Sequence, residues 1–160
     1  MSIELMRNLL RDLGAEIGIP ALAPDEDGFC CLDIGGRVRL SLQYDPEGQD
    51  LALFAPLCRL AGGEDRAEAQ AAMLAGNMLW AGTQGGTLAV EPAEGTAFLQ
   101  MKEKIQELDR ASLVALVERF VQVAEVWQDR LAPYAADAAG SAAAEPADAA
   151  PRPADLIRLA

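Results

Sequence analysis

Apolar residues follow two different spacings along residues 1–131, and the chain changes from one spacing to the other several times. Residues 2–17 carry an apolar side chain at every third or fourth position, which is the repeat of a helix with one buried face. Strands instead alternate apolar and polar side chains, and this alternation is found in residues 30–34, 38–43 and 51–60. Gly35-Gly36 and Asp45-Pro46-Glu47-Gly48 favour tight turns between these segments. The first half of the chain is therefore predicted to be one helix followed by three antiparallel strands.

The second half of this region repeats the order in a shorter form. A second helix is predicted to begin at Asp65, which forms a capping-box pattern with Glu68, and to end before Gly82. Strands at residues 87–91 and 96–102 then predict a second hairpin. A long apolar stripe over residues 110–131, with Asp109 as its N-cap, predicts a third helix. The order α-β-β-β-α-β-β-α indicates an α+β fold in which helices pack on a single layer of antiparallel sheet.

Two features bear on how these elements pack. Pro56 interrupts the third strand, and it predicts either an edge position or a bulge because proline lacks the N–H that a sheet ladder uses. The second helix has an apolar face that combines small residues with Leu74, Met78 and Leu79. Such a face permits the close approach of another helix or of a sheet.

The composition changes after residue 131. Alanine dominates residues 135–154, with proline, glycine and aspartate between the alanines. This segment has too few bulky side chains to offset the entropy of ordering it. We therefore expect one domain over residues 1–131 and a disordered Ala/Pro-rich tail over residues 132–160. A short apolar patch near the end of the tail, at residues 154–159, is either a docking segment or a frayed end of the chain.

The sequence has few of the residue patterns that enzymes use for catalysis. It has no histidine, and no local pattern supplies a base for Cys30, Cys31 or Cys58 as nucleophiles. Neighbouring residues of a strand point to opposite faces, so Cys30 and Cys31 are poorly placed to share a metal ion. An odd number of cysteines also disfavours a closed set of disulfides. We expect no catalysis, no metal and no cofactor.

The net charge of −12 narrows the range of partners. Nucleic acids and anionic membranes both bind basic patches, so neither is expected as a partner. The acidic and polar residues within residues 2–17 do not fit a signal peptide, and no apolar run is long enough to cross a membrane. We expect a cytoplasmic protein. Its acidic surface serves either solubility alone or the attraction of basic partners.

Several short segments carry a family resemblance through their order and spacing. They are Leu9-Leu10-x-x-Leu13-Gly14, Leu22-x-x-Asp25-Glu26-Asp27-Gly28, Leu53-Phe54-Ala55-Pro56-Leu57, Ala75-Gly76-Asn77-Met78-Leu79-Trp80 with Gly82-Thr83, Leu88-Ala89-Val90-Glu91-Pro92, and Leu113-x-x-Leu116-Val117-Glu118-Arg119-Phe120. With these segments, the chain resembles the Tir chaperone (CesT) family, the class I chaperones of bacterial type III secretion. The resemblance covers roughly residues 1–131 and leaves out the Ala-rich tail.

The resemblance implies a homodimer that binds the N-terminal segment of a secreted effector protein in extended form. Such a chaperone keeps its effector soluble and export-competent without hydrolysing ATP, and the secretion machinery is a further candidate partner. Members of the family dimerise mainly through the second helix and neighbouring strands. Carried over to this chain, the implied dimer interface comprises Ala71, Leu74, Met78, Leu79, Trp80 and Val90. The alternative is that these residues pack inside the monomer.

The resemblance also implies effector contacts on the first helix and on the outer side of the sheet. The corresponding residues are Leu9, Leu10, Phe29, Cys31, Arg37, Arg39 and Phe54. Strand alternation places Phe29, Cys31 and Phe54 on the face opposite the presumed core residues. One of the two leucines is expected to help form an apolar patch, and the two arginines either pair with acidic groups or solubilise the sheet. The alternative function is a non-enzymatic regulatory or adaptor module that uses the C-terminal tail. Removing residues 132–160 would distinguish the two functions.

Overall fold

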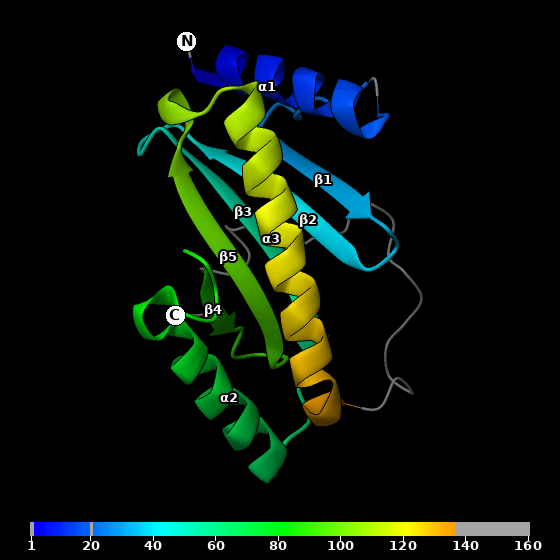
Figure 1. Ribbon diagram of the computed structural model, residues 1–160, viewed down its shortest axis with the longest axis vertical. Coiled ribbons are helices and arrows are strands. Elements are labelled where there is room, and N and C mark those ends of the chain that lie inside the picture. The colour runs from blue at the N-terminus through cyan, green and yellow to red at the C-terminus, as the bar shows by residue number, and fades with distance from the viewer. Residues whose placement is uncertain (1, 20, 137–160) are drawn as a thin grey trace.

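The computed structural model describes residues 2–19 and 21–136, and it has the predicted order of helices and strands (Figure 1). The α-helices are α1 (Ser2–Ile17), α2 (Gly63–Asn77) and α3 (Arg110–Leu131). The strands are β1 (Phe29–Ile34), β2 (Val38–Asp45), β3 (Asp50–Arg59), β4 (Thr87–Val90) and β5 (Thr96–Lys104). Short 3-10 helices follow α2, β5 and α3, namely η1 (Met78–Trp80), η2 (Ile105–Glu107) and η3 (Ala132–Tyr134).

The expected tail lies mostly outside the described residues. Residues 137–160 are not described, so the expectation of disorder there stays a prediction. Residues 132–136 still contact the domain, since Ala135 forms an isolated antiparallel bridge with Leu60. The N–H of Ala136 also donates to the carbonyl of Arg59 at 2.8 Å.

The strands form one antiparallel sheet in the order β1-β2-β3-β5-β4. This order places β3 in the middle, so the edge position suggested by Pro56 is wrong, whereas the bulge is confirmed by a register shift between Pro56 and Cys58. The pairing of β2 with β3 ends at Phe54, and Pro56 pairs only with Phe98 of β5. A proline is tolerated in this central strand because its β2 side needs no ladder bond at that point.

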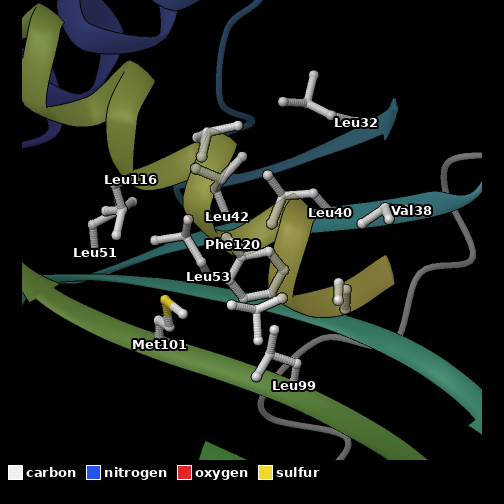
Figure 2. Close-up of a cluster of buried hydrophobic side chains, with 14 of the residues drawn as sticks. Leu32, Val38, Leu40, Leu42, Leu51, Leu53, Leu99, Met101, Leu116 and Phe120 are labelled. Atoms are coloured by element: carbon white, nitrogen blue, oxygen red, sulfur yellow. The ribbon is translucent and has the colours of Figure 1, made fainter. Parts of the chain in front are cut away.

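The main core lies between α3 and the face of the sheet that α3 crosses (Figure 1). Phe120 and Leu116 of α3 lie among strand residues such as Leu42, Leu53 and Leu99 (Figure 2). The whole predicted stripe of this helix is buried, namely Leu113, Leu116, Val117, Phe120, Ala124, Trp127 and Leu131. Burial of a large apolar side chain stabilises the fold by roughly 1.5–3 kcal/mol, so this stripe fixes α3 on the sheet.

The start of α3 confirms Asp109 as its N-cap. The Asp109 carboxylate accepts a hydrogen bond from the backbone N–H of Ser112 at 2.8 Å, and the Ser112 hydroxyl accepts one from the N–H of Asp109 at 2.8 Å. The bond from Ser112 holds the pKa of the Asp109 carboxyl below its usual value. This reciprocal pair is a capping box, and it determines where the helix begins.

The second helix, α2, differs from the prediction in its start. It begins at Gly63 with Gly62 as its N-cap, and no side chain caps it. The predicted capping box of Asp65 and Glu68 is therefore wrong, and Asp65 lies inside the first turn. A carboxylate in that turn still stabilises the helix, because it faces the positive end of the helix dipole.

Candidate interaction surfaces

The apolar face predicted for α2 is real, but it points to solvent. The residues that α2 buries are Ala69, Met73 and Gly76. The large apolar side chains at its end are exposed instead, with exposed fractions of 71% for Leu74, 71% for Met78, 81% for Leu79 and 58% for Trp80. We call these four residues the helix-turn surface. Four large apolar side chains gathered in seven residues are unusual on a soluble monomer, and such a patch marks an interaction site.

The other two residues implied for the dimer interface border this surface. Ala71 lies one helical turn before Leu74 and is exposed. Val90, at the end of β4, is half-buried and packs partly against the main core. The predicted interface residues therefore lie on α2, η1 and β4, which are in contact. None of the four large side chains packs in the core formed by the described residues. The alternative, that they pack inside the monomer, is therefore wrong for these four residues.

The turn that carries the helix-turn surface has an uncommon backbone. Leu79 has φ 51° and Trp80 has φ 55°, in the left-handed region that side chains other than glycine rarely adopt. Each such residue costs roughly 1–2 kcal/mol. The carbonyl of Trp80 accepts hydrogen bonds from the N–H groups of Thr83 at 3.1 Å and Gln84 at 2.9 Å. These bonds tie the strained turn to the loop that follows it.

The base of the turn is packed against the core helix α3. An added Cβ at Gly76 would lie 2.3 Å from the Trp127 ring, so only glycine allows α2 to approach α3 this closely. The Trp127 indole N–H donates to the carbonyl of Gly82 at 2.8 Å, and the N–H of Gly82 donates to the carbonyl of Gly76 at 3.0 Å. Trp127 thus holds both the helix end and the loop after the turn.

A second, smaller apolar cluster lies on the sheet face opposite the main core. Phe29 of β1 and Phe54 of β3 pack with ring centroids 6.5 Å apart, and Cys31 packs against them. The register places Cys31 beside Ser41 and Ser41 beside Phe54, so these side chains share one face of the sheet. The structure therefore brings together the three apolar residues that strand parity assigned to the outer side.

A groove continues this outer face toward the other edge of the sheet. It has a volume of about 470 Å³ and is lined by residues of β3, β4 and β5 and of the β4–β5 turn. Its apolar lining includes Ala52, Phe54, Ala89, Val90, Pro92 and Phe98. We call it the outer-sheet groove. Sequence reasoning missed Phe98, although its position one residue before the buried Leu99 places it on the outer face by strand alternation.

The two arginines expected near the outer face, Arg37 and Arg39, lie in different surroundings. Arg39 is half-buried and pairs in register with Asp33 across β1 and β2. Arg37 lies in the turn before β2, and its guanidinium donates to the Asp129 carboxylate of α3 at 2.6 Å. Arg37 is therefore held at the end of α3 by an exposed ion pair, away from the Phe29–Phe54 cluster.

Leu9 and Leu10 of α1 are both buried in the main core, with exposed fractions of 5% and 0%. The expectation that one of them forms a surface patch does not fit this placement. The reason is that α1 packs against both α3 and η2, so a wide arc of the helix is covered. Exposed apolar residues occur at the end of α1 instead, at Ile17 and Ile19.

Cys30 and Cys58 do not offer reactive thiolates. Burial raises the pKa of the Cys30 thiol to about 11, with smaller contributions from Cys31 and Asp25, and burial also raises the pKa of Cys58. Both thiols therefore stay protonated at neutral pH, where a thiol is a weak nucleophile and a weak metal ligand. Within residues 2–19 and 21–136, no group of three or more His, Cys, Asp or Glu side chains is placed to hold a metal ion.

None of the helices within the described residues combines the length and the apolar content that crossing a membrane requires.

Comparison with known proteins gives a family match over most of the chain. The sequence model of the Tir chaperone protein (CesT) family matches residues 8–128. This range contains both the helix-turn surface and the outer-sheet groove. No curated protein sequence matches the chain.

Solved structures of similar fold include one described as a type III secretion chaperone. The fold is similar to one in the ExsC–ExsE complex, with a TM-score of 0.70 and 22% identity over 81% of this chain and 95% of the other. It is similar to one in the HopA1–SchA chaperone–effector complex, with a TM-score of 0.65 and 19% identity over 81% and 97%. A third is the Yersinia pestis chaperone SycH with a fragment of YscM2, with a TM-score of 0.58 and 18% identity over 76% and 98%.

Proposed function

The chain belongs to the Tir chaperone protein (CesT) family, and from this premise we propose that it is a homodimeric type III secretion chaperone. In this role it binds the N-terminal segment of a secreted effector in extended form and keeps that effector soluble and export-competent. The observation that carries the proposal is the presence of two separate apolar surfaces on one small acidic domain. One surface serves the second copy of the chain, and the other serves the effector.

The helix-turn surface is the proposed dimer interface. Leu74, Met78, Leu79 and Trp80 expose more than half of each side chain, although each is large and apolar. A second copy that covers these side chains removes apolar area from water, at roughly 25 cal/mol for each Å². Aromatic residues and methionine are enriched at the centre of protein interfaces, which fits Trp80 and Met78. The half-buried Val90 and the exposed Ala71 form the border of the same interface.

The outer face of the sheet is the proposed effector site. The outer-sheet groove offers apolar contacts on β3, β4 and β5, and the Phe29–Phe54 cluster, whose two phenylalanines are 8% and 5% exposed, supports it from below. Ordering a flexible segment costs roughly 1–2 kcal/mol per residue. At roughly 25 cal/mol per Å², each ordered effector residue then needs on the order of 60 Å² of apolar burial to break even. A long surface of this kind meets that requirement better than one enclosed pocket.

The proposed action is non-enzymatic and takes place in the cytoplasm, where an effector waits for export. It needs no cofactor, because the work is done by covering apolar segments of the effector. The net charge of −12 keeps the complex soluble while its apolar surfaces are occupied.

The experiment is co-expression of the chain with candidate effectors that are encoded nearby, followed by size-exclusion chromatography with light scattering. We expect a complex that contains two copies of the chain and the N-terminal part of one effector. Leu79→Asp should yield a monomer, because it places a carboxylate in the proposed interface. Gln100→Asp, at an exposed position of the groove lining, should leave the dimer intact and weaken effector binding, because it places a carboxylate in the groove without burying it.

Each variant is the control for the other, since one changes the helix-turn surface and the other changes the outer face. The dimer would be contradicted if the wild-type chain remained monomeric at high micromolar concentration. The effector site would be contradicted if Gln100→Asp retained the effector as tightly as the wild type.

A further inference from the structure

At the open edge of the sheet, one residue of β4 is capped by a side chain from α2. The Leu88 N–H donates to the Asn77 side-chain oxygen at 2.8 Å, and the Asn77 amide N–H donates to the Leu88 carbonyl at 3.0 Å. In an antiparallel pair, the N–H and C=O of one residue point to the same side and are satisfied by a neighbouring strand. Asn77 therefore satisfies Leu88 as a neighbouring strand would, although it is the last residue of α2.

The same residue begins the strained turn. Asn77 directly precedes Met78, Leu79 and Trp80, whose side chains make up most of the helix-turn surface. A turn with two left-handed residues in sequence persists only where its surroundings fix it from both ends. After the turn, Gly82 is held by Gly76 and by the indole N–H of Trp127. Before the turn, the two hydrogen bonds between Asn77 and Leu88 supply the corresponding anchor.

Capping Leu88 and anchoring the turn are two roles of Asn77, and both affect how the helix-turn surface can bind a second chain. An uncovered strand edge is a template for pairing with another chain. With its N–H and C=O occupied by Asn77, Leu88 cannot pair with a strand of another chain, and the helix-turn surface lies directly after Asn77 in the sequence. The side chains of that surface are presented by a turn that Asn77 itself holds in place.

We propose that Asn77 is the positioning residue of the dimer interface, which it shapes by anchoring the Met78–Trp80 turn to β4 through the backbone of Leu88. The proposal rests on the proposed function, because it requires that the helix-turn surface binds a second copy of the chain. It adds a residue that does not touch the partner and yet determines how tightly the partner binds.

The test compares the full-length Asn77→Ala chain with the wild type by sedimentation equilibrium. We expect the Kd of the dimer to rise roughly tenfold or more, since two side-chain to backbone hydrogen bonds of the turn are lost. In amide hydrogen exchange, the Leu88 N–H should exchange faster in the variant. The tryptophan fluorescence, to which Trp80 and the buried Trp127 both contribute, should shift to longer wavelength at protein concentrations where the wild type is dimeric. Asn8→Ala is the matched control, because Asn8 is exposed on α1, and it should leave all three readouts unchanged.

A second variant guards against loss of the fold in Asn77→Ala. Asn77→Asp keeps an acceptor for the Leu88 N–H but places a carboxylate oxygen against the Leu88 carbonyl. We expect protection of the Leu88 amide to be retained while the dimer Kd still rises. All measurements are made at least 15 degrees below the thermal midpoint of each variant, so that global unfolding does not contribute.

The proposal is overturned if the wild type is dimeric and both Asn77 variants dimerise with its Kd while their thermal midpoints fall, because Asn77 would then only stabilise the monomer. A wild-type chain that is monomeric under all conditions would instead overturn the dimer of the proposed function. The two failures are therefore distinguishable from the wild-type measurement alone.

Discussion

At the scale of single residues, Asp50 is a buried charge that links two neighbouring strands. Its side chain is only 7% exposed and lies between the ammonium groups of Lys102 at 2.8 Å and Lys104 at 2.9 Å. The hydrogen bonds from these two lysines hold the pKa of Asp50 below its usual value, and the bond to Asp50 raises the pKa of Lys102. The ionised carboxylate thereby ties the start of β3 to the end of β5.

Asp50→Asn should therefore change how stability depends on pH. The folded pKa of Asp50 lies below the unfolded value of about 3.9, so its contribution is present above that pH and is lost as the pH falls through the folded pKa. We expect the variant to have a lower thermal midpoint than the wild type at pH 7, and the difference to shrink below about pH 4. Thermal unfolding followed by circular dichroism between pH 7 and pH 3 measures it. Glu118→Gln, at an exposed position, is the control, and a difference independent of pH would contradict the assignment.

Gly76→Ala tests the close approach of α2 to α3. Helix propensity alone favours alanine over glycine by about 1 kcal/mol. The added methyl group would lie 2.3 Å from Cζ2 and 2.7 Å from Cη2 of Trp127, whose ring is fully buried and cannot easily move. We expect the clash to prevail and the free energy of unfolding in urea to fall by about 1–3 kcal/mol. Gln70→Ala, on the exposed face of the same helix, should change it by less than about 0.5 kcal/mol; a stabilised Gly76→Ala variant would contradict the packing.

At the scale of elements, periodicity reveals which side chains share a face but not what covers that face. For α3 the sequence indicated both the buried face and the element that covers it, because its apolar stripe is long and one face of the predicted sheet had to be buried by a helix. For α2 the stripe of Leu74 and Met78 suggested packing against a helix or a sheet, yet in the described monomer it faces solvent. The buried face consists of Ala69, Met73 and Gly76, and two of these are too small to stand out in a hydrophobic pattern.

Strand order is the part of the fold that local sequence could not determine. Pro56 predicted that β3 is either an edge strand or a strand with a bulge. Which of the two occurs depends on the pairing of β3 with β5, which lies more than forty residues away in sequence at this point. The same limit applies to the candidate sites. Strand parity correctly placed Phe29 and Phe54 together on one face, whereas the contact of Arg37 with Asp129 and the burial of Leu9 and Leu10 depend on how α3 and α1 pack.

At the scale of the whole molecule, the two proposed surfaces meet at β4. Val90 lines the outer-sheet groove and also borders the helix-turn surface, and Asn77 joins α2 to the same strand through Leu88. A second copy bound at the helix-turn surface would therefore lie close to one end of the groove. This arrangement fits a chaperone in which the dimer presents two grooves to one extended effector.

The net charge of the molecule sets the expected salt dependence of that dimer. Each chain carries a formal charge of −12, so two copies repel each other at long range, whereas the helix-turn surface that joins them contains no charged side chain. Added salt screens the repulsion, since the Debye length falls from about 10 Å at 0.1 M to about 3 Å at 1 M, and it leaves apolar contacts intact. We therefore expect the dimer Kd from sedimentation equilibrium to decrease between 50 mM and 500 mM sodium chloride. Leu79→Asp should remain monomeric at both salt concentrations, and a wild-type Kd that rises with salt would show that ion pairs, rather than apolar contacts, hold the two copies together.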